Sequence, residues 1–397
     1  MILCAELQMG GESHVKINGA FLAILSRLSD QCLVFAEESH YRALLRESSG
    51  ERGDPGERGR CVVSHQKITV AHRSRNRLVK EILGVINVIR LRSAVRRLRP
   101  EFVFVFSASP IMKVLLSKIA ARTGVKFIMV CHGELEGLSS PGPRRIHRQN
   151  WWTEKLLSSP GRFSYLLIPS SFVYENLMQY VSAGYRSRII CFEHPIIFGT
   201  ARTDEPVPFG GASFVSAGVA SIAKSSHLIF ELAEKAKRVS SQTAFRFALI
   251  GRVEEAVAAR SNGLVDFRMS GSLLSFEEFA EGVRSADYLL YFYQDELYRL
   301  VPSGALLDAL LYEKPVIAFD NGIMRNFFRV YGAVGVLCAD TDAMADTIAK
   351  LAGGRDAHAA FVRAIRGAKA RFSIASQAEC FARLLKDSCA ISAGGNR

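Results

Sequence analysis

The stretch YRLVPSGALLDALLYEKPVIAFDNG, Tyr298–Gly322, decides the fold, because a loop, a helix and a buried strand follow one another in it without interruption. The tripeptide PSG marks a helix start, and we expect Ser303 to be its N-cap. Free amides in a first helical turn bind anions. Ser303 and Gly304 are therefore candidates for an anion site. Asp308 is an acid on an otherwise apolar helix, and either a salt bridge, solvent exposure or a hydroxyl-bearing ligand would satisfy it.

The same strand–loop–helix unit recurs on both sides of this stretch. Continuous apolar strands separated by helices predict a parallel sheet covered on both faces. In the first half, the predicted strands are Met1–Ala5, Cys32–Ala36, Phe102–Phe106, Lys126–Cys131, Tyr165–Pro169 and Arg188–Phe192. The predicted helices there are Val15–Leu28, Arg77–Leu98 and Pro110–Arg122. Ser48–Arg60 is rich in Gly and charge and is expected to be a loop.

A second series follows a break at Pro195–Gly211, which we take as the linker. Its predicted strands are Ser213–Ala217, Phe245–Ile250, Val265–Met269, Tyr288–Tyr293, Pro315–Phe319 and Gly335–Cys338. Its predicted helices are Lys224–Val239, Phe276–Ser285 and Ser303–Tyr312, with a last helix near Ile374–Asp387. The fold class is thus α/β, with two Rossmann-like, doubly wound parallel-sheet domains facing a cleft. We expect domains at 1–200 and 201–375, and a C-terminal helix and tail at 376–397.

Composition places the chain among ordinary globular proteins. It has 397 residues, of which 49% are hydrophobic and 22% charged. None of the eight cysteines form a C-x-x-C pair, so we expect reduced cysteines and no metal site. We see no signal peptide and no apolar run long enough to span a membrane. We therefore expect a cytoplasmic protein, associated peripherally with the inner face of the membrane.

The charge balance points to anionic partners. The formal net charge is +13, and nine Lys or Arg lie between Arg73 and Arg99 with one acid, Glu81. Arg92, Arg96 and Arg99 share one helical face, so this segment is a basic amphipathic helix. It is either a solvated face of a domain helix or a docking site for an anionic membrane. We find no nucleic-acid-binding motif.

Three loops at strand ends carry the remaining candidates. In MGGESHV, Met9–Val15, Gly10 and Gly11 let a ligand approach the backbone at a helix start. In VCHGELEG, His132 follows a buried strand and can bind a hydroxyl or a phosphate, or satisfy loop carbonyls. In SAGVASIAKSSHL, Gly218 ends a strand and Lys224 can meet a diphosphate, or be an ordinary surface lysine.

Together these loops resemble the GT-B glycosyltransferases, and in particular the retaining group called family four or group one. The opening of that group is Gly-Gly-x-Glu-x-His-Val, and its phosphate lysine follows a glycine by six residues, as Lys224 follows Gly218. The other stretches that carry the resemblance are Phe163–Leu177, Ser285–Tyr293 and Ser303–Ala318.

The chain departs from this group at two positions of the donor site. The group has two glutamates eight residues apart. Asp308 matches the second, whereas the first falls on Leu300, and Asp295 or Glu296 would have to replace it. The group's arginine after the glycine is Val219 here, and Arg252 is a candidate for the missing charge.

The resemblance implies transfer of a sugar from a nucleoside diphosphate sugar, with retention and without a cofactor or metal. By the same resemblance, Lys224 and the amides of Ser303 and Gly304 stabilise the departing diphosphate, and Asp308 holds the ribose. His132 binds the donor sugar or orients the acceptor hydroxyl. Gly10 and Gly11 admit the diphosphate.

The basic segment 73–99 fits a lipid-linked or polysaccharide acceptor in bacterial surface glycan synthesis. Two alternatives stay open. One is a non-catalytic scaffold in polysaccharide assembly, which Leu300 and Val219 favour. The other is a nucleotide-sugar epimerase, although we identify no acidic pairs for it.

Overall fold

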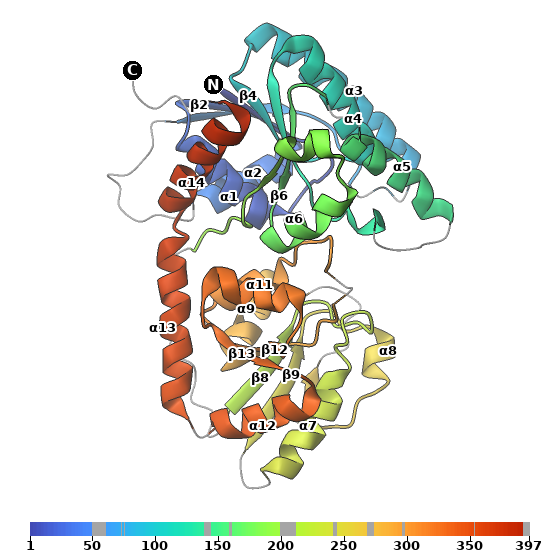
Figure 1. Cartoon of the computed structure of the whole chain (residues 1–397). Coiled ribbons are helices and arrows are strands. Elements are labelled where there is room, and N and C mark those ends of the chain that lie inside the picture. The colour runs from blue at the N-terminus through green and yellow to red at the C-terminus, as the bar shows by residue number, and fades with distance from the viewer. Residues whose placement is uncertain are drawn as a thin grey trace. The chain divides into compact units, whose positions relative to one another are not determined.

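The chain folds into two compact units, each built on its own parallel sheet. The computed structural model describes residues 1–49, 61–72, 74, 76–138, 144–158, 161–198, 212–240, 244–267, 274–295, 298–352 and 354–391. The first unit comprises 1–200, 300–302 and 372–397, and the second comprises 201–299 and 303–371 (Figure 1). The expected loop at 48–60 and linker at 195–211 fall largely outside the described residues.

The first unit has a seven-stranded sheet in the order β3-β2-β1-β4-β5-β6-β7, and all neighbouring strands are parallel. Its strands are β1 Ile2–Glu6, β2 Gln31–Ala36, β3 Val62–Lys67, β4 Phe102–Ser107, β5 Lys126–Val130, β6 Ser164–Ile168 and β7 Ile189–Cys191. Its helices are α1 Val15–Ser26, α2 Glu38–Ser48, α3 Arg77–Leu98, α4 Pro110–Thr123, α5 Arg144–Ser158, α6 Ser171–Leu177 and α14 Ile374–Cys389.

The central strand β4 shows why this sheet is covered on both faces. Its sequence, FVFVFS, is fully buried, and its side chains alternate between two cores. Val103 and Val105 belong to the core under α3, α4 and α5, while Phe104 belongs to the core under α1 and α14. Helices α3, α4 and α5 lie side by side over the first of these faces (Figure 1).

Local signals fix where α4 begins and ends. The Ser109 hydroxyl accepts the Met112 N–H, and Pro110 occupies the first turn, where a missing N–H costs nothing. Gly124 ends the helix at φ 71°, a left-handed conformation that favours glycine. The helix therefore starts directly beyond the carboxyl end of β4.

The second unit has a six-stranded sheet in the order β10-β9-β8-β11-β12-β13, again parallel throughout. Its strands are β8 Ala212–Ala217, β9 Phe245–Ile250, β10 Val265–Phe267, β11 Tyr288–Tyr291, β12 Val316–Phe319 and β13 Gly335–Cys338. Its helices are α7 Leu228–Val239, α8 Glu255–Ala258, α9 Phe276–Arg284, α10 Ala305–Leu311, α11 Gly322–Tyr331, α12 Thr341–Ala352 and α13 Arg355–Arg371.

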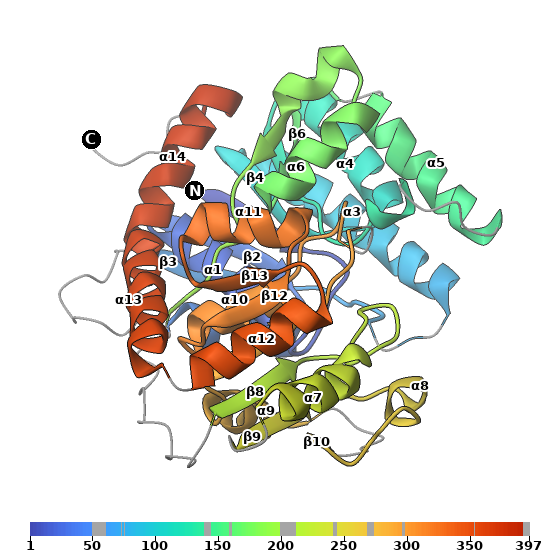
Figure 2. The same cartoon turned by 60° about the horizontal axis from the view of Figure 1, so that its bottom comes forward.

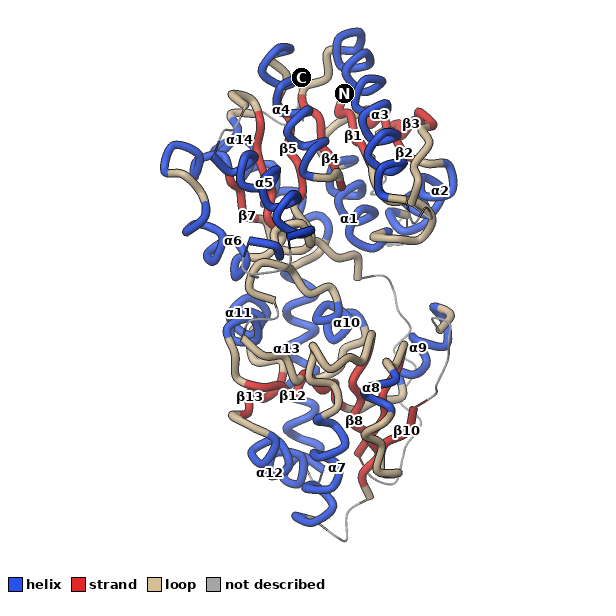
Figure 3. Tube along the Cα trace, turned by 90° about the vertical axis from the view of Figure 1, so that its right-hand side faces the viewer, coloured by secondary structure: helices blue, strands red, loops and turns tan. Residues whose placement is uncertain are grey.

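Helices cover both faces of this sheet as well. Helices α7 and α12 pack against each other on one face, as Figure 2 shows. Helices α10 and α11 lie on the other face (Figure 3). The predicted α/β class and the two parallel sheets are confirmed.

Two predicted starts of helices are wrong. Helix α7 begins at Leu228 rather than Lys224, because Ser225 takes a left-handed φ of 54° and interrupts the turn before it. Helix α10 has Gly304 at its N-cap and no side-chain cap, so Ser303 is not the cap.

Candidate active site

The predicted site residues follow strands at the point where each sheet reverses its order. In open α/β sheets, ligands bind outside the carboxyl ends of the strands at this switch point. The first sheet reverses between β1 and β4, and the second between β8 and β11. Gly10 and Gly11 follow β1, whereas Gly218 and Lys224 follow β8. Each unit therefore has its own candidate site.

The glycine loop after β1 is held from two sides. Gly11 has φ +60°, and its carbonyl oxygen lies 2.8 Å from His40 Nδ1. The Gly11 N–H donates to Glu37 Oε2 at 3.4 Å. A Cβ on Gly10 would lie 2.3 Å from His72 Nδ1. Only glycine fits at position 10 while His72 keeps its place.

A buried carboxylate that the sequence reading missed organises the same loop. Glu6 is 0% exposed and ends β1. It accepts the backbone N–H of Gln8 at 2.9 Å and of Met9 at 2.8 Å. It also accepts Asn18 Nδ2 at 2.9 Å and the Ser107 hydroxyl at the end of β4. These hydrogen bonds compensate for the burial of the Glu6 carboxylate. The bond to Ser107 also joins β1 to β4, the two strands that flank the switch point. The sequence did contain a signal for this residue, which is an acidic side chain at the end of the apolar run ILCAE.

His132 follows β5 with a defined tautomer. Its Nε2 lies 2.8 Å from the Phe106 carbonyl oxygen, which can only accept, so Nε2 carries the proton. Nδ1 is then the acceptor of the neutral ring. Burial, the nearby His14 ring and the Lys113 charge lower the pKa of His132 well below its ordinary value. His132 is therefore neutral at pH 7, and its Nδ1 can accept a hydrogen bond.

A buried ion pair fixes the loop that carries His132. Lys113 on α4 is 0% exposed, and its ammonium pairs with Glu134 Oε1 and donates to the Val130 carbonyl at 2.7 Å. Glu134 Oε2 accepts the backbone N–H of His132 at 2.9 Å. The sequence reading missed this pair, because nothing local marks Lys113 as a partner of a residue 21 positions away.

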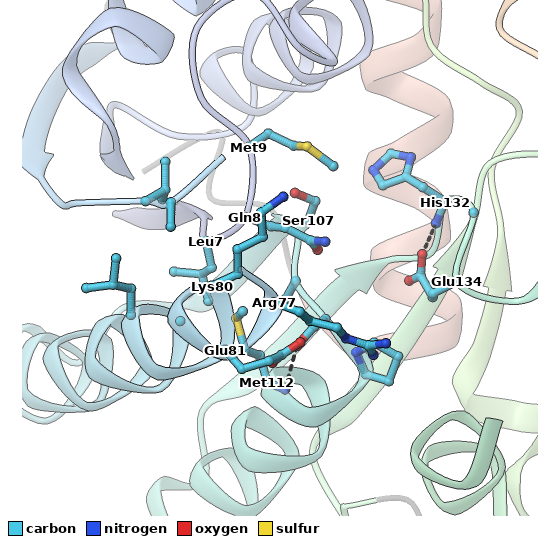
Figure 4. A pocket seen from close by; sticks show the side chains of 18 of the residues that line it. Leu7, Gln8, Met9, Arg77, Lys80, Glu81, Ser107, Met112, His132 and Glu134 are labelled. Atoms are coloured by element: carbon cyan, nitrogen blue, oxygen red, sulfur yellow. Dashed lines mark hydrogen bonds between the residues drawn. The ribbon is translucent and has the colours of Figure 1, made fainter. Parts of the chain in front are cut away.

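A cavity of about 560 Å³ opens beside these residues in the first unit. It lies at the switch point, since its wall includes Met9 after β1 and Ser109 after β4. His132 and Glu134 line one side, and Arg77, Lys80 and Glu81 reach it from α3 (Figure 4). The Ser109 hydroxyl donates to Glu81 Oε2 at 2.7 Å, across the cavity wall.

The second unit brings two backbones together after β8. Gly218 has φ +105° and Gly251 has φ +124°. A Cβ on Gly251 would lie 2.1 Å from the Gly218 carbonyl oxygen, so the close approach requires glycine. The Gly218 N–H donates to the Ile250 carbonyl at 2.8 Å. Gly251 was missed, although the sequence reading had singled out its neighbour Arg252.

Lys224 lies in the turn between β8 and α7 and is half-buried. Its backbone N–H donates to Ser221 Oγ at 3.3 Å. The adjacent Ser225 hydroxyl accepts Gln294 Nε2 at 3.4 Å. This bond ties the loop after β8 to the loop after β11, across the switch point of the second sheet.

Ser303 and Gly304 end that second loop, and Asp308 lies in the first turn of α10. The Ser303 hydroxyl lies 3.5 Å from the Tyr293 hydroxyl, and Gly304 is exposed. Asp308 is half-buried and lies close to Tyr291. Burial raises the pKa of Tyr291, and the charge of Asp308 raises it further. The Tyr291 hydroxyl donates to the Ala305 carbonyl at 2.8 Å and holds the start of the helix.

The residues at which the chain departs from the resembled family, and their candidate replacements, lie in different surroundings. The side chain of Arg252 is 51% exposed, and its guanidinium is 3.9 Å from Glu254. Leu300 is 1% exposed and groups with the first unit. Asp295 Oδ1 accepts the Gly322 N–H at 3.0 Å, and Glu296 lies outside the described residues. Val219 is half-buried.

Three negative findings apply to the residues that the structure describes. They contain no group of three or more His, Cys, Asp or Glu residues placed to hold a metal ion. None of their helices is both long and apolar enough to cross a membrane. All eight cysteines are free thiols.

Residues 40–191 match the model of Glycosyltransferase Family 4. No curated protein matches the chain in sequence. A glycosyltransferase from Rickettsia africae ESF-5 is similar in structure, with a TM-score of 0.63, 14% identity and 98% of each chain covered. Anabaena HepE in complex with UDP and glucose has a TM-score of 0.62 and 13% identity, covering 97% of this chain and 99% of its own.

Sucrose-phosphate synthase from Thermosynechococcus elongatus has a TM-score of 0.64 and 13% identity, covering 99% of this chain and 100% of its own. At such low identity these structures establish the fold alone, which is two parallel-sheet α/β domains of the GT-B type. The match over residues 40–191 and this fold together support a glycosyltransferase enzyme.

Proposed function

We propose that the chain is a retaining glycosyltransferase of the family-four type, which transfers a sugar from a nucleoside diphosphate sugar. One observation carries the proposal. Within a fold that supports a glycosyltransferase, the loops after β8 and β11 meet at the switch point of the second sheet and bring Lys224 toward the loop that ends in Ser303. Lysine and free helix amides both suit a diphosphate.

The chemistry follows from the charge that develops on the leaving group. As the glycosidic bond breaks, negative charge accumulates on the diphosphate, and preorganised donors stabilise it. Lys224 and the amides of Ser303 and Gly304 supply this stabilisation. Asp308 accepts hydrogen bonds from the ribose hydroxyls. His132 is neutral, so its Nδ1 accepts a hydrogen bond from a hydroxyl of the donor sugar or of the acceptor.

Protection by nucleotides tests the donor site. The melting temperature would be measured with UDP, GDP, ADP and their sugars, on wild type, Asp308→Ala and Asp308→Asn. Asp346→Ala, at an exposed position on α12, is the matched control. A ligand at a hundredfold excess over its Kd stabilises the folded state by about 2.7 kcal/mol. We expect one nucleotide to protect wild type and the control but neither Asp308 variant. Absence of protection by every nucleotide at millimolar concentration contradicts the proposal.

The finer proposal is that the acceptor is a lipid-linked intermediate of bacterial surface glycan synthesis, reached from the inner face of the membrane. Arg90, Arg96, Arg97 and Arg99 are exposed at the end of α3 and support docking on anionic lipid. Sedimentation with vesicles of phosphatidylglycerol or of phosphatidylcholine at low salt tests it. Transfer to soluble acceptors only, with no binding to the anionic vesicles, contradicts it.

A non-catalytic scaffold remains the second candidate, because Leu300 places an apolar, buried side chain where the resembled family has a glutamate. A scaffold binds the nucleotide sugar without turnover. Release of nucleoside diphosphate in the presence of membrane extract separates the two candidates. The anomeric configuration of the product, read by NMR, tests retention.

A further inference from the structure

Cys131 is a buried thiol that lies against a lysine side chain. It follows β5 directly, is 1% exposed and belongs to the core under α3, α4 and α5. Nζ of Lys113 on α4 donates a hydrogen bond to Cys131 Sγ at 3.6 Å. The proposed sugar transfer does not use this thiol. Because an oxidised thiol condenses with a nearby nitrogen atom, a cysteine in contact with an amine is a candidate for covalent modification.

The ammonium of Lys113 is held in place by all three of its N–H donors. It donates to the Val130 carbonyl at 2.7 Å, to Cys131 Sγ, and to Glu134 Oε1, with which it also forms the ion pair. The whole lysine side chain is buried, at 0% exposure for the residue. Nζ is therefore fixed next to the sulfur atom.

The same group of side chains can supply a neutral amine. Burial lowers the pKa of Lys113 and raises the pKa of Cys131, while the attraction between the two charges opposes both shifts. Glu134 Oε1 is in contact with the ammonium and can take its proton. A neutral amine is a nucleophile, whereas an ammonium ion is not.

A small oxidant has a short path to the sulfur atom. His132, Gly133 and Glu134 line the cavity of the first unit, and Cys131 precedes them directly in the chain. The Glu134 side chain is 16% exposed and contacts Lys113 from the wall of the cavity. The thiol thus lies just behind this wall, where hydrogen peroxide can reach it and a large thiol cannot.

An unpartnered hydroxyl lies in the same core as Cys131. Tyr185 is 0% exposed, and its hydroxyl has no hydrogen-bond partner among the described residues. Burial raises the pKa of Tyr185, and the charge of a Cys131 thiolate raises it further. Buried polar groups are nearly always paired. An oxygen atom added to the Cys131 sulfur supplies an acceptor in the region of this hydroxyl.

We propose that Lys113 and Cys131 are an oxidative modification site, at which a peroxide joins Nζ to Sγ through a sulfenamide bond. First, the thiol attacks hydrogen peroxide. An S–O bond forms, the O–O bond breaks and water leaves, so sulfur loses two electrons to the peroxide. Second, the neutral amine attacks the sulfenic sulfur. An N–S bond forms, the S–O bond breaks, and hydroxide leaves as water with a proton from nitrogen. One thiol, one amine and one peroxide thus give the N–S bond and two waters.

The new bond changes the surroundings of His132 without touching it. Glu134 accepts the His132 backbone N–H at 2.9 Å through Oε2, while Oε1 is held by Lys113. Once Nζ is bonded to sulfur and Glu134 holds the proton, the ion pair is lost. The glutamate is then less firmly oriented and a weaker acceptor for the His132 N–H. Oxidation would therefore loosen the loop that carries His132.

Mass spectrometry of the full chain tests the proposal. The folded protein is treated with hydrogen peroxide and digested without a reducing agent. We expect two peptides joined between Lys113 and Cys131, lighter by two hydrogen atoms than their sum, which dithiothreitol separates. Cys131→Ala should abolish the joined pair. Cys338→Ala is the matched control, because Cys338 is also buried but its sulfur lies 3.5 Å from the Thr347 hydroxyl instead of an amine. It should change the yield by less than twofold.

The same oxidation in urea separates the folded geometry from chance encounters. We expect the yield of the joined pair to fall at least tenfold in the unfolded chain. Equal yields in the folded and unfolded protein overturn the proposal. It is also overturned if Cys131 stays a thiol, or stops at a sulfenic or sulfinic acid, while the exposed Cys380 is oxidised.

Hydrogen exchange measures the effect on the loop. We expect the His132 amide to exchange at least fivefold faster in the cross-linked protein than in the reduced protein. Peroxide should leave this rate unchanged in Cys131→Ala. An unchanged rate in the cross-linked wild type overturns the effect on His132. None of these measurements depends on turnover, so their failure is distinct from a failure of the transferase proposal.

Discussion

Lys113 and Glu134 form a buried ion pair that connects helix α4 to the loop after β5. The lysine side chain is 1% exposed and the glutamate side chain 16%. Glu134 also accepts the His132 N–H. The position of His132 therefore depends, through Glu134, on Lys113, which is not part of the cavity wall.

Removing one partner of this pair should be costly. We expect Lys113→Met to lower the free energy of unfolding by about 3–5 kcal/mol, because it leaves an uncompensated carboxylate in a largely buried site. The control is Lys118→Met at an exposed position on the same helix, which should stay within about 0.5 kcal/mol of wild type. Urea unfolding measures both. Recovery of stability in the double variant Lys113→Met, Glu134→Leu supports the ion pair. Equal losses of stability in Lys113→Met and Lys118→Met contradict it.

Gly251→Ala should destabilise the second unit more than Gly263→Ala does. Both glycines have positive φ, at 124° and 76°, but a Cβ at Gly251 meets the Gly218 carbonyl whereas one at Gly263 meets nothing within 4 Å. We expect about 1–2 kcal/mol at Gly263 from backbone strain alone. At Gly251 we expect a further loss of about 1–3 kcal/mol from the clash. Equal changes in urea unfolding would show that the close approach does not exist in solution.

Stability should fall as the pH is lowered below about 6.5, the ordinary pKa of histidine. Burial lowers the pKa of His194 to about 4 in the folded state. The unfolded chain therefore binds the proton first, and stability present above pH 6.5 is lost as the pH falls toward 4. The loss from this residue approaches about 3 kcal/mol. His194→Gln should make the dependence of urea unfolding on pH shallower. An unchanged dependence would exclude His194 as its source.

Phe381→Ala should destabilise the first unit although it lies near the end of the chain. The ring is 0% exposed and lies 4.9 Å from Phe192 and 5.9 Å from Phe104, between centroids. Truncating a buried phenylalanine costs about 3–5 kcal/mol. The neighbouring Cys380 is exposed, so Cys380→Ala should change stability by less than about 0.5 kcal/mol. Limited proteolysis should cut the first unit faster in Phe381→Ala, and similar cutting rates in both variants would argue against a core role for Phe381.

The fold was largely predictable because its central strands are continuous apolar runs. FVFVFS in β4 could be read as a buried strand without any other information. Strand β3 was missed because its sequence, VVSHQK, is polar and mostly exposed at the edge of the sheet. Its pairing with β2 supplies the stability that its composition lacks.

The site was less predictable, because its key contacts join distant parts of the chain. The glycines after β1 and β8 indicated their loops, because glycine is the residue that permits a close approach to the backbone. Glu6 bonds to Ser107, 101 residues away, and no local pattern records such a bond. Ser303 was assigned as a cap from its neighbours alone, whereas the helix starts one residue later.

The return of α14 to the first unit has a consequence for the order of folding during synthesis. The ribosome makes residues 1–200 first, and domains commonly fold in that order as they emerge. Here the core around Phe104 is closed by Phe381, from a helix translated after the whole second unit. The apolar face of the nascent first unit therefore stays uncovered until the last helix leaves the exit tunnel. A chain that stops at residue 371 would carry all of its second unit and a permanently unfinished first one.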